Sequence, residues 1–248
     1  SEAPLDVSFI SHIQDLLRMN PELFYERRVP QKSADFREGE SILDQIRKED
    51  KMLSYPYEAI RPFLNMLTEA AEDDRVISIK MTLYRLARQS KVIEALCEAA
   101  ENGKEVVVLV ELRARFDEEN NINWANKLEK AGCHVIYGLQ GLKTHCKIAL
   151  VVRQEEDGIR RYLHLGTGNY NDSTAKIYTD MGLFTCNSQY GADASSLFNV
   201  ITGYSRPPEY RHFVVAPNTM RPFFCRMIKN ETENAKHGLP SGIHAKVN

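Results

Sequence analysis

The chain has 248 residues, of which 43% are hydrophobic and 27% are charged, and its formal net charge at pH 7 is -2. This composition excludes a disordered tail, and the small net charge excludes a general attraction to nucleic acid or to an anionic membrane. Any phosphate-binding surface must therefore be a local cluster of arginine and lysine side chains.

The cysteines and the first residues of the chain indicate the cellular compartment in which the protein is expected. The five cysteines are scattered and form no CxxC pair, which favours a reducing compartment over a disulfide framework or a zinc site. The opening residues SEAPLDVSFI lack the basic region of a signal peptide, and no apolar run approaches the ~20 residues of a membrane helix. We expect a cytoplasmic protein with no transmembrane segment, and a peripheral position at the inner membrane is a second option.

Helices and strands are expected to alternate along most of the chain. Hydrophobic periodicity and turn residues predict helices over 7–19, 42–48, 57–71, 90–101 and 121–131, and strands over 52–54, 75–84, 105–112, 133–137, 144–153 and 159–165. Strands separated by helices imply right-handed crossovers and a parallel sheet that is covered on both faces. The last two strands form a hairpin, so the predicted fold class is α/β with a mixed sheet flanked by helices.

The stretch 141–171 carries the densest set of chemical groups. In the strand expected over 144–153, a period of two would put His145 and Lys147 on the same face. The turn at 155–158 returns a second strand to the sequence GTGN at 166–169, beside the first strand. We therefore expect His145, Lys147 and this turn to lie close together, and Lys147 is predicted to be a catalytic residue alongside the histidine.

An HxK triplet on a strand, followed by a hairpin and a G-[S/T]-x-N turn, resembles the half-site of the phospholipase D superfamily, which uses histidine as a nucleophile on phosphorus. The aspartate that usually stands five residues after the lysine is Val152 here, which argues against an ordinary phosphodiesterase. The triplet has little weight alone, because His244 and Lys246 form another one.

Arginines follow two of the expected strands, at the edge where ligands bind in open α/β sheets. Arg85 and Arg88 follow the strand over 75–84, and Arg113 and Arg115 follow the strand over 105–112. Their planar guanidinium groups match phosphate oxygens. Contact with solvent or with the carboxylates at 117–119 is the alternative.

A further strand is expected over 177–179, where alternation would put Tyr178 and Asp180 on one face. A carboxylate beside a histidine fixes its tautomer and stabilises its charged form, so Asp180 is the predicted orienting partner of His145. A bond from Asp180 to backbone is the alternative. The sequence contains no Walker loop and no evident metal triad, and four histidines are interpreted as structural or exposed: His134, His164, His212 and His237.

The strings YRLARQS, VELRARFDEENNINWANKLEKAG, GLKTHCKIALVV, RRYLHLGTGNYN and IYTDMGLFT, in this order, are similar to bacterial polyphosphate kinase, the family that makes inorganic polyphosphate from ATP. The resemblance spans about 41–248. It implies a phosphohistidine on His145, phosphate contacts from Arg85, Arg115 and Asn169, and a nucleotide contact from Tyr178. Mg²⁺ would lie near the two arginines through phosphate oxygens, because arginine is a poor direct ligand for it.

The resemblance also implies that the chain is a piece of a four-domain enzyme. Residues 1–35 would be the tail of a preceding domain, 36–208 a phospholipase D-like catalytic domain, and 209–248 the beginning of a second one. A short internal repeat, 59–64 echoed by 219–224, supports the second unit. The partners implied are ATP or ADP, polyphosphate and further copies of the full-length protein, without nucleic acid.

Two other functions remain open at this point. One is a phospholipase D-superfamily phosphodiesterase or nuclease, which would also use His145 but would hydrolyse a diester. The other is a non-catalytic module that binds polyphosphate. If the polyphosphate kinase interpretation holds, we expect this chain alone to be inactive as an enzyme.

Overall fold

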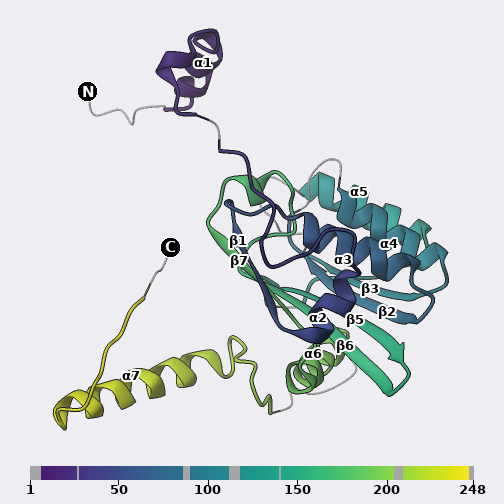
Figure 1. Ribbon diagram of the computed structural model, residues 1–248, viewed down its shortest axis with the longest axis vertical. Helices are drawn as coiled ribbons and strands as arrows, with labels where there is room; N and C mark the ends of the chain where they lie inside the picture. Colours follow the sequence, from purple (N-terminus) through teal and green to yellow (C-terminus); the bar gives the residue numbers. More distant parts are fainter. Residues whose placement is uncertain are drawn as a thin grey trace.

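The computed structural model describes residues 7–26, 28–85, 90–111, 118–139, 141–203 and 209–245, without the side chains of 118–120. In these ranges one mixed sheet has the strand order β1-β7-β6-β5-β2-β3-β4 (Figure 1). Its strands are β1 (Lys51–Tyr55), β2 (Val76–Leu83), β3 (Glu105–Val110), β4 (His134–Tyr137), β5 (Lys147–Glu155), β6 (Gly158–Gly166) and β7 (Asp180–Thr185). β2, β3 and β4 are parallel and the other neighbouring pairs are antiparallel, so the predicted mixed sheet is confirmed.

Helices cover both faces of the sheet, as expected (Figure 1). The helices α2 (Ile42–Lys48), α3 (Arg61–Glu72), α4 (Lys91–Glu101) and α5 (Glu118–Lys130) contribute to a large apolar core on one face, and α6 (Ser188–Ile201) covers a smaller core on the other. The residues of β5 alternate between the two cores: Ala149 and Val151 face the first, and Ile148 and Leu150 face the second. The strand is thus apolar on both sides, which explains its continuous hydrophobic sequence.

Helix starts follow local capping chemistry. Ser41 precedes α2 and its hydroxyl accepts a hydrogen bond from the Asp44 N–H at 3.0 Å. The helix expected from residue 57 begins instead at Arg61, because Glu58 is engaged elsewhere. The Glu58 N–H donates to the Ser54 carbonyl at 2.9 Å, and its carboxylate accepts from the Ser54 N–H at 2.7 Å. Glu58 also forms an isolated bridge with Gln31, and together these bonds keep the backbone before residue 60 out of the helix.

Two helices lie apart from the sheet in Figure 1, namely α1 (Phe9–Leu16) and α7 (Met220–Lys236). Neither helix has a buried residue. The repeated segments 59–64 and 219–224 each lead into a helix, α3 and α7 respectively. Short 3-10 turns occur at η1 (Pro21–Leu23) and η2 (Thr174–Lys176). Among the described residues, no helix is long and apolar enough to cross a membrane.

His164, on β6, lies in the core. Its ring centroid is 4.5 Å from that of Phe63 and 4.6 Å from that of Phe184, and its Nδ1 is 3.0 Å from the Tyr170 hydroxyl. Only 2% of the residue is exposed, and burial lowers the pKa of His164 to about 3. Its neighbour Gly182 has no room for a side chain, because a Cβ there would meet the imidazole. The histidine is structural, as interpreted from the sequence.

We expect His164→Leu to flatten the acid dependence of stability. The unfolded chain takes up a proton near the ordinary pKa of 6.5, whereas the folded chain resists protonation down to about 3. The unfolding free energy should therefore fall as pH drops through this window, by about 1.4 kcal/mol per pH unit for one proton. Urea unfolding at several pH values from 7 to 4 should give a shallower slope for the leucine variant, even if it is less stable at pH 7.

The exposed His134 on β4 provides the control. His134→Leu should leave the pH slope of the wild type unchanged. Identical slopes for the wild type and His164→Leu would contradict the assignment of this acid sensitivity to the buried imidazole.

Candidate active site

Three of the predicted site residues, Arg85, His145 and Lys147, gather where the carboxyl end of β2 meets the start of β5. The two strands are antiparallel neighbours, with Met81 opposite Ala149, so the residues that follow β2 lie beside those that precede β5. Tyr84 and Arg85 come directly after β2, and His145 stands two residues before β5. This edge also carries the carboxyl ends of β3 and β4, which is where open α/β sheets bind ligands.

The ring of Tyr84 is the centre of this group. Its centroid is 4.9 Å from that of the His145 imidazole, in an edge-to-face contact. The Nζ atoms of Lys143 and Lys147 lie 5.3 and 5.2 Å from the Tyr84 centroid, and the Cζ atom of Arg85 lies 5.8 Å from it. These are cation–π distances. We call the five residues the Tyr84 cluster; its three cations next to an imidazole favour an anionic ligand.

His145 is exposed and lies in the loop before β5, so the expectation that it shares a strand face with Lys147 was wrong. β5 begins only at Lys147, because side chains rather than a neighbouring strand hold the preceding backbone. The Thr82 hydroxyl donates to the Cys146 carbonyl at 2.8 Å, and Lys147 Nζ donates to the His145 carbonyl. His145 and Lys147 nevertheless lie together, because both contact Tyr84.

The electrostatics of the cluster favour a neutral imidazole. Partial burial, followed by the charges of Lys147, Lys143 and Arg85, lowers the pKa of His145 below its ordinary value of 6.5. Burial also lowers the pKa of Lys147 to about 8, although the charge of Asp180 acts in the opposite direction. At pH 7 the imidazole therefore keeps a lone pair for nucleophilic attack.

We expect Lys143→Met to raise the pKa of His145, because it removes one of the charges that oppose protonation of the ring. The titration of the His145 ring can be followed by NMR between pH 5 and 8. As a control, Lys236→Met on α7 should leave this titration unchanged, since Lys236 is paired with Glu233. An unchanged pKa in the Lys143 variant would mean that solvent screens this exposed ammonium from the imidazole.

The GTGN turn lies next to Lys147, because Gly166 is the residue opposite Lys147 in the pairing of β5 with β6. Asp180 closes this turn from β7: its carboxylate accepts a hydrogen bond from the Thr167 hydroxyl at 2.8 Å. Gly168 must lack a side chain here, because a Cβ would overlap the Asp180 carboxylate. The turn is therefore fixed against the start of β7.

Two sequence expectations about β7 need correction. Asp180 has its hydrogen bond with Thr167 and, in the described part of the chain, none with His145, so the structure brings it to the GTGN turn and not to the imidazole. Tyr178 lies outside any strand, because β7 begins at Asp180 and η2 precedes it. The argument that Tyr178 and Asp180 alternate on one face was therefore wrong, and the Tyr178 side chain is exposed.

The remaining candidates are placed as follows. Asn169 is partly buried, its Oδ1 atom has no hydrogen-bond partner, and it lines a small cavity together with His164 and Asp180. Arg115, like Arg88 and Arg113, lies outside the described residues. Across the described ranges, no three His, Cys, Asp or Glu side chains are grouped so as to hold a metal ion. These residues therefore form no protein cage for Mg²⁺.

Sequence reasoning missed Tyr84 and Lys143. The signal for Lys143 was present in the alternating string KTHCK, which puts one lysine on each side of the histidine. Tyr84 gave no such signal, because an aromatic residue at a strand end is ordinarily part of the core.

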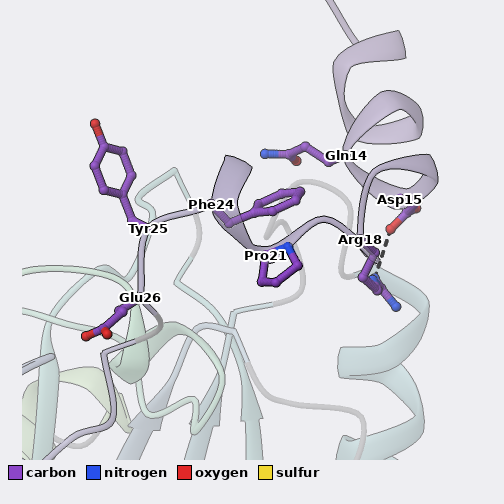
Figure 2. A pocket seen from close by; sticks show the side chains of 7 residues that line it. All are labelled: Gln14, Asp15, Arg18, Pro21, Phe24, Tyr25 and Glu26. Atoms are coloured by element: carbon purple, nitrogen blue, oxygen red, sulfur yellow. Dashed lines mark hydrogen bonds and ion pairs between the residues drawn. The ribbon is translucent and has the colours of Figure 1, made fainter.

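The hollow in Figure 2 belongs to the N-terminal segment and contains none of the predicted site residues. Its one arginine, Arg18, is paired with Asp15 at 2.8 Å, as the dashed line shows. The lining residues are Gln14, Asp15, Arg18, Pro21, Phe24, Tyr25 and Glu26. We therefore do not consider it a catalytic pocket.

Comparison with known proteins identifies the family of the chain. The chain is 49% identical to a polyphosphate kinase of Lactiplantibacillus plantarum over 99% of its length, and 50% identical to one of Halalkalibacterium halodurans over 100% of its length. It covers 34% and 35% of these two proteins, and so spans about a third of their length. The solved polyphosphate kinase of Porphyromonas gingivalis matches 91% of the chain, and the chain matches 38% of it, with 35% identity and a TM-score of 0.79.

A more distant match is a phospholipase D family member, Nuc from Salmonella typhimurium, with 14% identity and a TM-score of 0.49 over 65% of this chain and 99% of that one. The model of the family described as polyphosphate kinase C-terminal domain 1 matches residues 41–207, a range that includes the Tyr84 cluster. The chain therefore belongs to the polyphosphate kinase C-terminal domain 1 family.

Proposed function

We propose that His145 accepts the terminal phosphoryl group of ATP and passes it to inorganic polyphosphate, as part of a polyphosphate kinase. The observation that carries this proposal is the Tyr84 cluster, in which an exposed imidazole with a lowered pKa shares the Tyr84 ring with three cations. The names of the relatives support the choice of ATP and polyphosphate as substrates.

The reaction has two displacements. In the first, the unprotonated ring nitrogen of His145 attacks the terminal phosphorus, a P–N bond forms, and the P–O bond to the β-phosphate breaks so that ADP leaves. In the second, a terminal oxygen of polyphosphate attacks the same phosphorus, and the P–N bond breaks to regenerate the imidazole. The phosphoramidate is energy-rich, so we propose that the transfer runs in both directions.

In both steps the cations of the Tyr84 cluster would neutralise negative charge on the phosphoryl group. Phosphoryl transfer depends mainly on positioning and on neutralising charge at the transferring oxygens. Arg85, Lys143 and Lys147 contact the same Tyr84 ring as His145, so we propose that they neutralise this charge. We propose that Arg115 and Asn169 add phosphate contacts and that the exposed Tyr178 contacts the nucleotide.

We propose that Mg²⁺ enters with the nucleotide as part of the substrate. Phosphate oxygens and water, the ligands that Mg²⁺ prefers, would hold it.

We also propose that the full-length protein is a homo-oligomer without a nucleic-acid partner. Residues 36–208 would form the first of two phospholipase D-like units.

The test uses this chain in place of the matching segment of the Halalkalibacterium halodurans relative, so that the protein has the full length of its relatives. Incubation with γ-labelled ATP should label the protein, and the label should be lost in acid and kept in base, as expected for phosphohistidine. Hydrolysis of a diester without any label would favour a phosphodiesterase. Polyphosphate binding without label under any condition would favour a binding module.

A further inference from the structure

Glu111, which the sequence analysis did not single out, forms a hydrogen bond with the loop that carries His145. Glu111 follows β3 directly and is 3% exposed. Its Oε2 atom accepts a hydrogen bond from the Thr144 N–H at 2.9 Å. Thr144 immediately precedes His145, so this carboxylate fixes the backbone on the amino-terminal side of the imidazole.

Glu111 is itself anchored to the end of the sheet. Its N–H donates to the Leu83 carbonyl at 3.0 Å, which extends the β2–β3 pairing by one residue. From α5, the side-chain amide of Asn121 donates to the Glu111 and Tyr84 carbonyls, both at 2.9 Å. Asn121 is 1% exposed. One buried amide therefore ties the residue that holds Thr144 to the residue whose ring contacts His145.

The backbone around His145 is thus bonded at three successive residues. Glu111 accepts the Thr144 N–H, Lys147 donates to the His145 carbonyl, and Thr82 donates to the Cys146 carbonyl. A loop outside the sheet is not ordinarily held by hydrogen bonds at each of three successive residues, since loops tolerate motion better than strands do. A nucleophile does have this requirement, because a displacement of about 1 Å can cost roughly 100-fold in rate.

We propose that Glu111 is a positioning residue for His145, acting through its hydrogen bond to the Thr144 N–H, and that Asn121 supports it. The proposal rests on the proposed function of His145. The role requires an acceptor oxygen at the full length of the glutamate side chain, and it does not require the negative charge. Length and charge can be separated by substitution.

Two variants make this separation. Glu111→Gln keeps the length and one acceptor oxygen but loses the charge, whereas Glu111→Asp keeps the charge and withdraws the oxygens by one methylene. In the full-length chimera we expect the aspartate variant to lower kcat for phosphoryl transfer about 10- to 100-fold, with KM changed less than about threefold. The glutamine variant should stay within about threefold of the wild type in both constants.

If the aspartate variant is active and the glutamine variant is impaired, the negative charge rather than the side-chain length determines activity, and the proposal is overturned. Wild-type kinetics in both variants would also overturn it. Asn121→Ala should lower kcat in the same direction as Glu111→Asp, since it releases the carbonyls of Glu111 and Tyr84. A wild-type kcat in a folded Asn121 variant would remove Asn121 from the proposal.

One measurement is independent of activity. In this chain without substitution, the Thr144 amide should be protected from hydrogen exchange although it lies in a loop outside the strands, and Glu111→Gln should retain this protection. Exchange of the Thr144 amide at the rate of an unstructured peptide would overturn the positioning role. If the chimera forms no phosphoenzyme, the proposed function fails, and the amide measurement still decides whether Glu111 holds the loop.

Discussion

His145→Ala is expected to abolish phosphoenzyme formation in the full-length chimera. The imidazole is the proposed acceptor of the phosphoryl group, and the Tyr84 cluster holds no second histidine among its five residues. Removal of a catalytic nucleophile lowers kcat on the order of 10⁴- to 10⁶-fold in enzymes that depend on one. The measurement is the amount of acid-labile label after incubation with γ-labelled ATP.

The fold should survive this substitution. His145 is exposed and its side chain fills no core position, so the unfolding free energy should change by only about 0.5 kcal/mol. His134→Ala, at another exposed histidine, serves as the matched control and should label like the wild type. Acid-labile label that persists in the His145 variant would remove this residue from the mechanism.

The second large effect is expected at Arg153, on β5. Its guanidinium is 1% exposed and pairs with Asp73 at 2.8 Å and with Glu155 at 3.1 Å, and it reaches Asp44 on α2 at 3.3 Å. The Glu155 side chain is itself 3% exposed and also accepts a hydrogen bond from the Tyr162 hydroxyl. Arg153 therefore neutralises two carboxylates that have little access to water, Glu155 at 3% exposed and Asp73 at 13%.

Arg153→Leu should lower the unfolding free energy by about 3 kcal/mol, because Glu155 and Asp73 lose their buried cation. Their remaining cations are more exposed, namely Arg47 at 3.4 Å from Glu155 and Arg75 at 3.0 Å from Asp73. Urea unfolding at pH 7 is the measurement. Arg160→Leu is the control, since Arg160 pairs at 2.6 Å with Asp157, whose side chain is 60% exposed, and surface pairs contribute about 0–1 kcal/mol.

A double variant tests the cause. Adding Glu155→Leu to Arg153→Leu removes a carboxylate that has lost its buried cation, and it should recover part of the lost stability. Replacing both members of a buried ion pair lowers the unfolding free energy less than removing one member does. A loss below about 1 kcal/mol for Arg153→Leu would show that water reaches this cluster. No recovery in the double variant would show that Asp73 rather than Glu155 determines the cost.

The sequence by itself determined the features that depend on local chemistry. The β5–β6 hairpin was predicted because a polar turn separates two apolar runs, and the observed pairing of Glu155 with Gly158 follows from it. The helix starts at Ser41 and Ser90 follow from side chains that cap the next few N–H groups. Hydrophobic periodicity likewise gave the alternation of helices and strands, because it reflects which side of each element meets a core.

Tertiary structure alone decided how the site is assembled. β5 begins at Lys147 rather than at 144 because Thr82 and Glu111, which are remote in the sequence, bind the backbone of the preceding loop. Asp180 contacts Thr167 instead of His145 because the pairing of β6 with β7 brings it to the GTGN turn. Hydrogen bonds between residues so far apart depend on strand order and register, and a local pattern of residues contains no information about either.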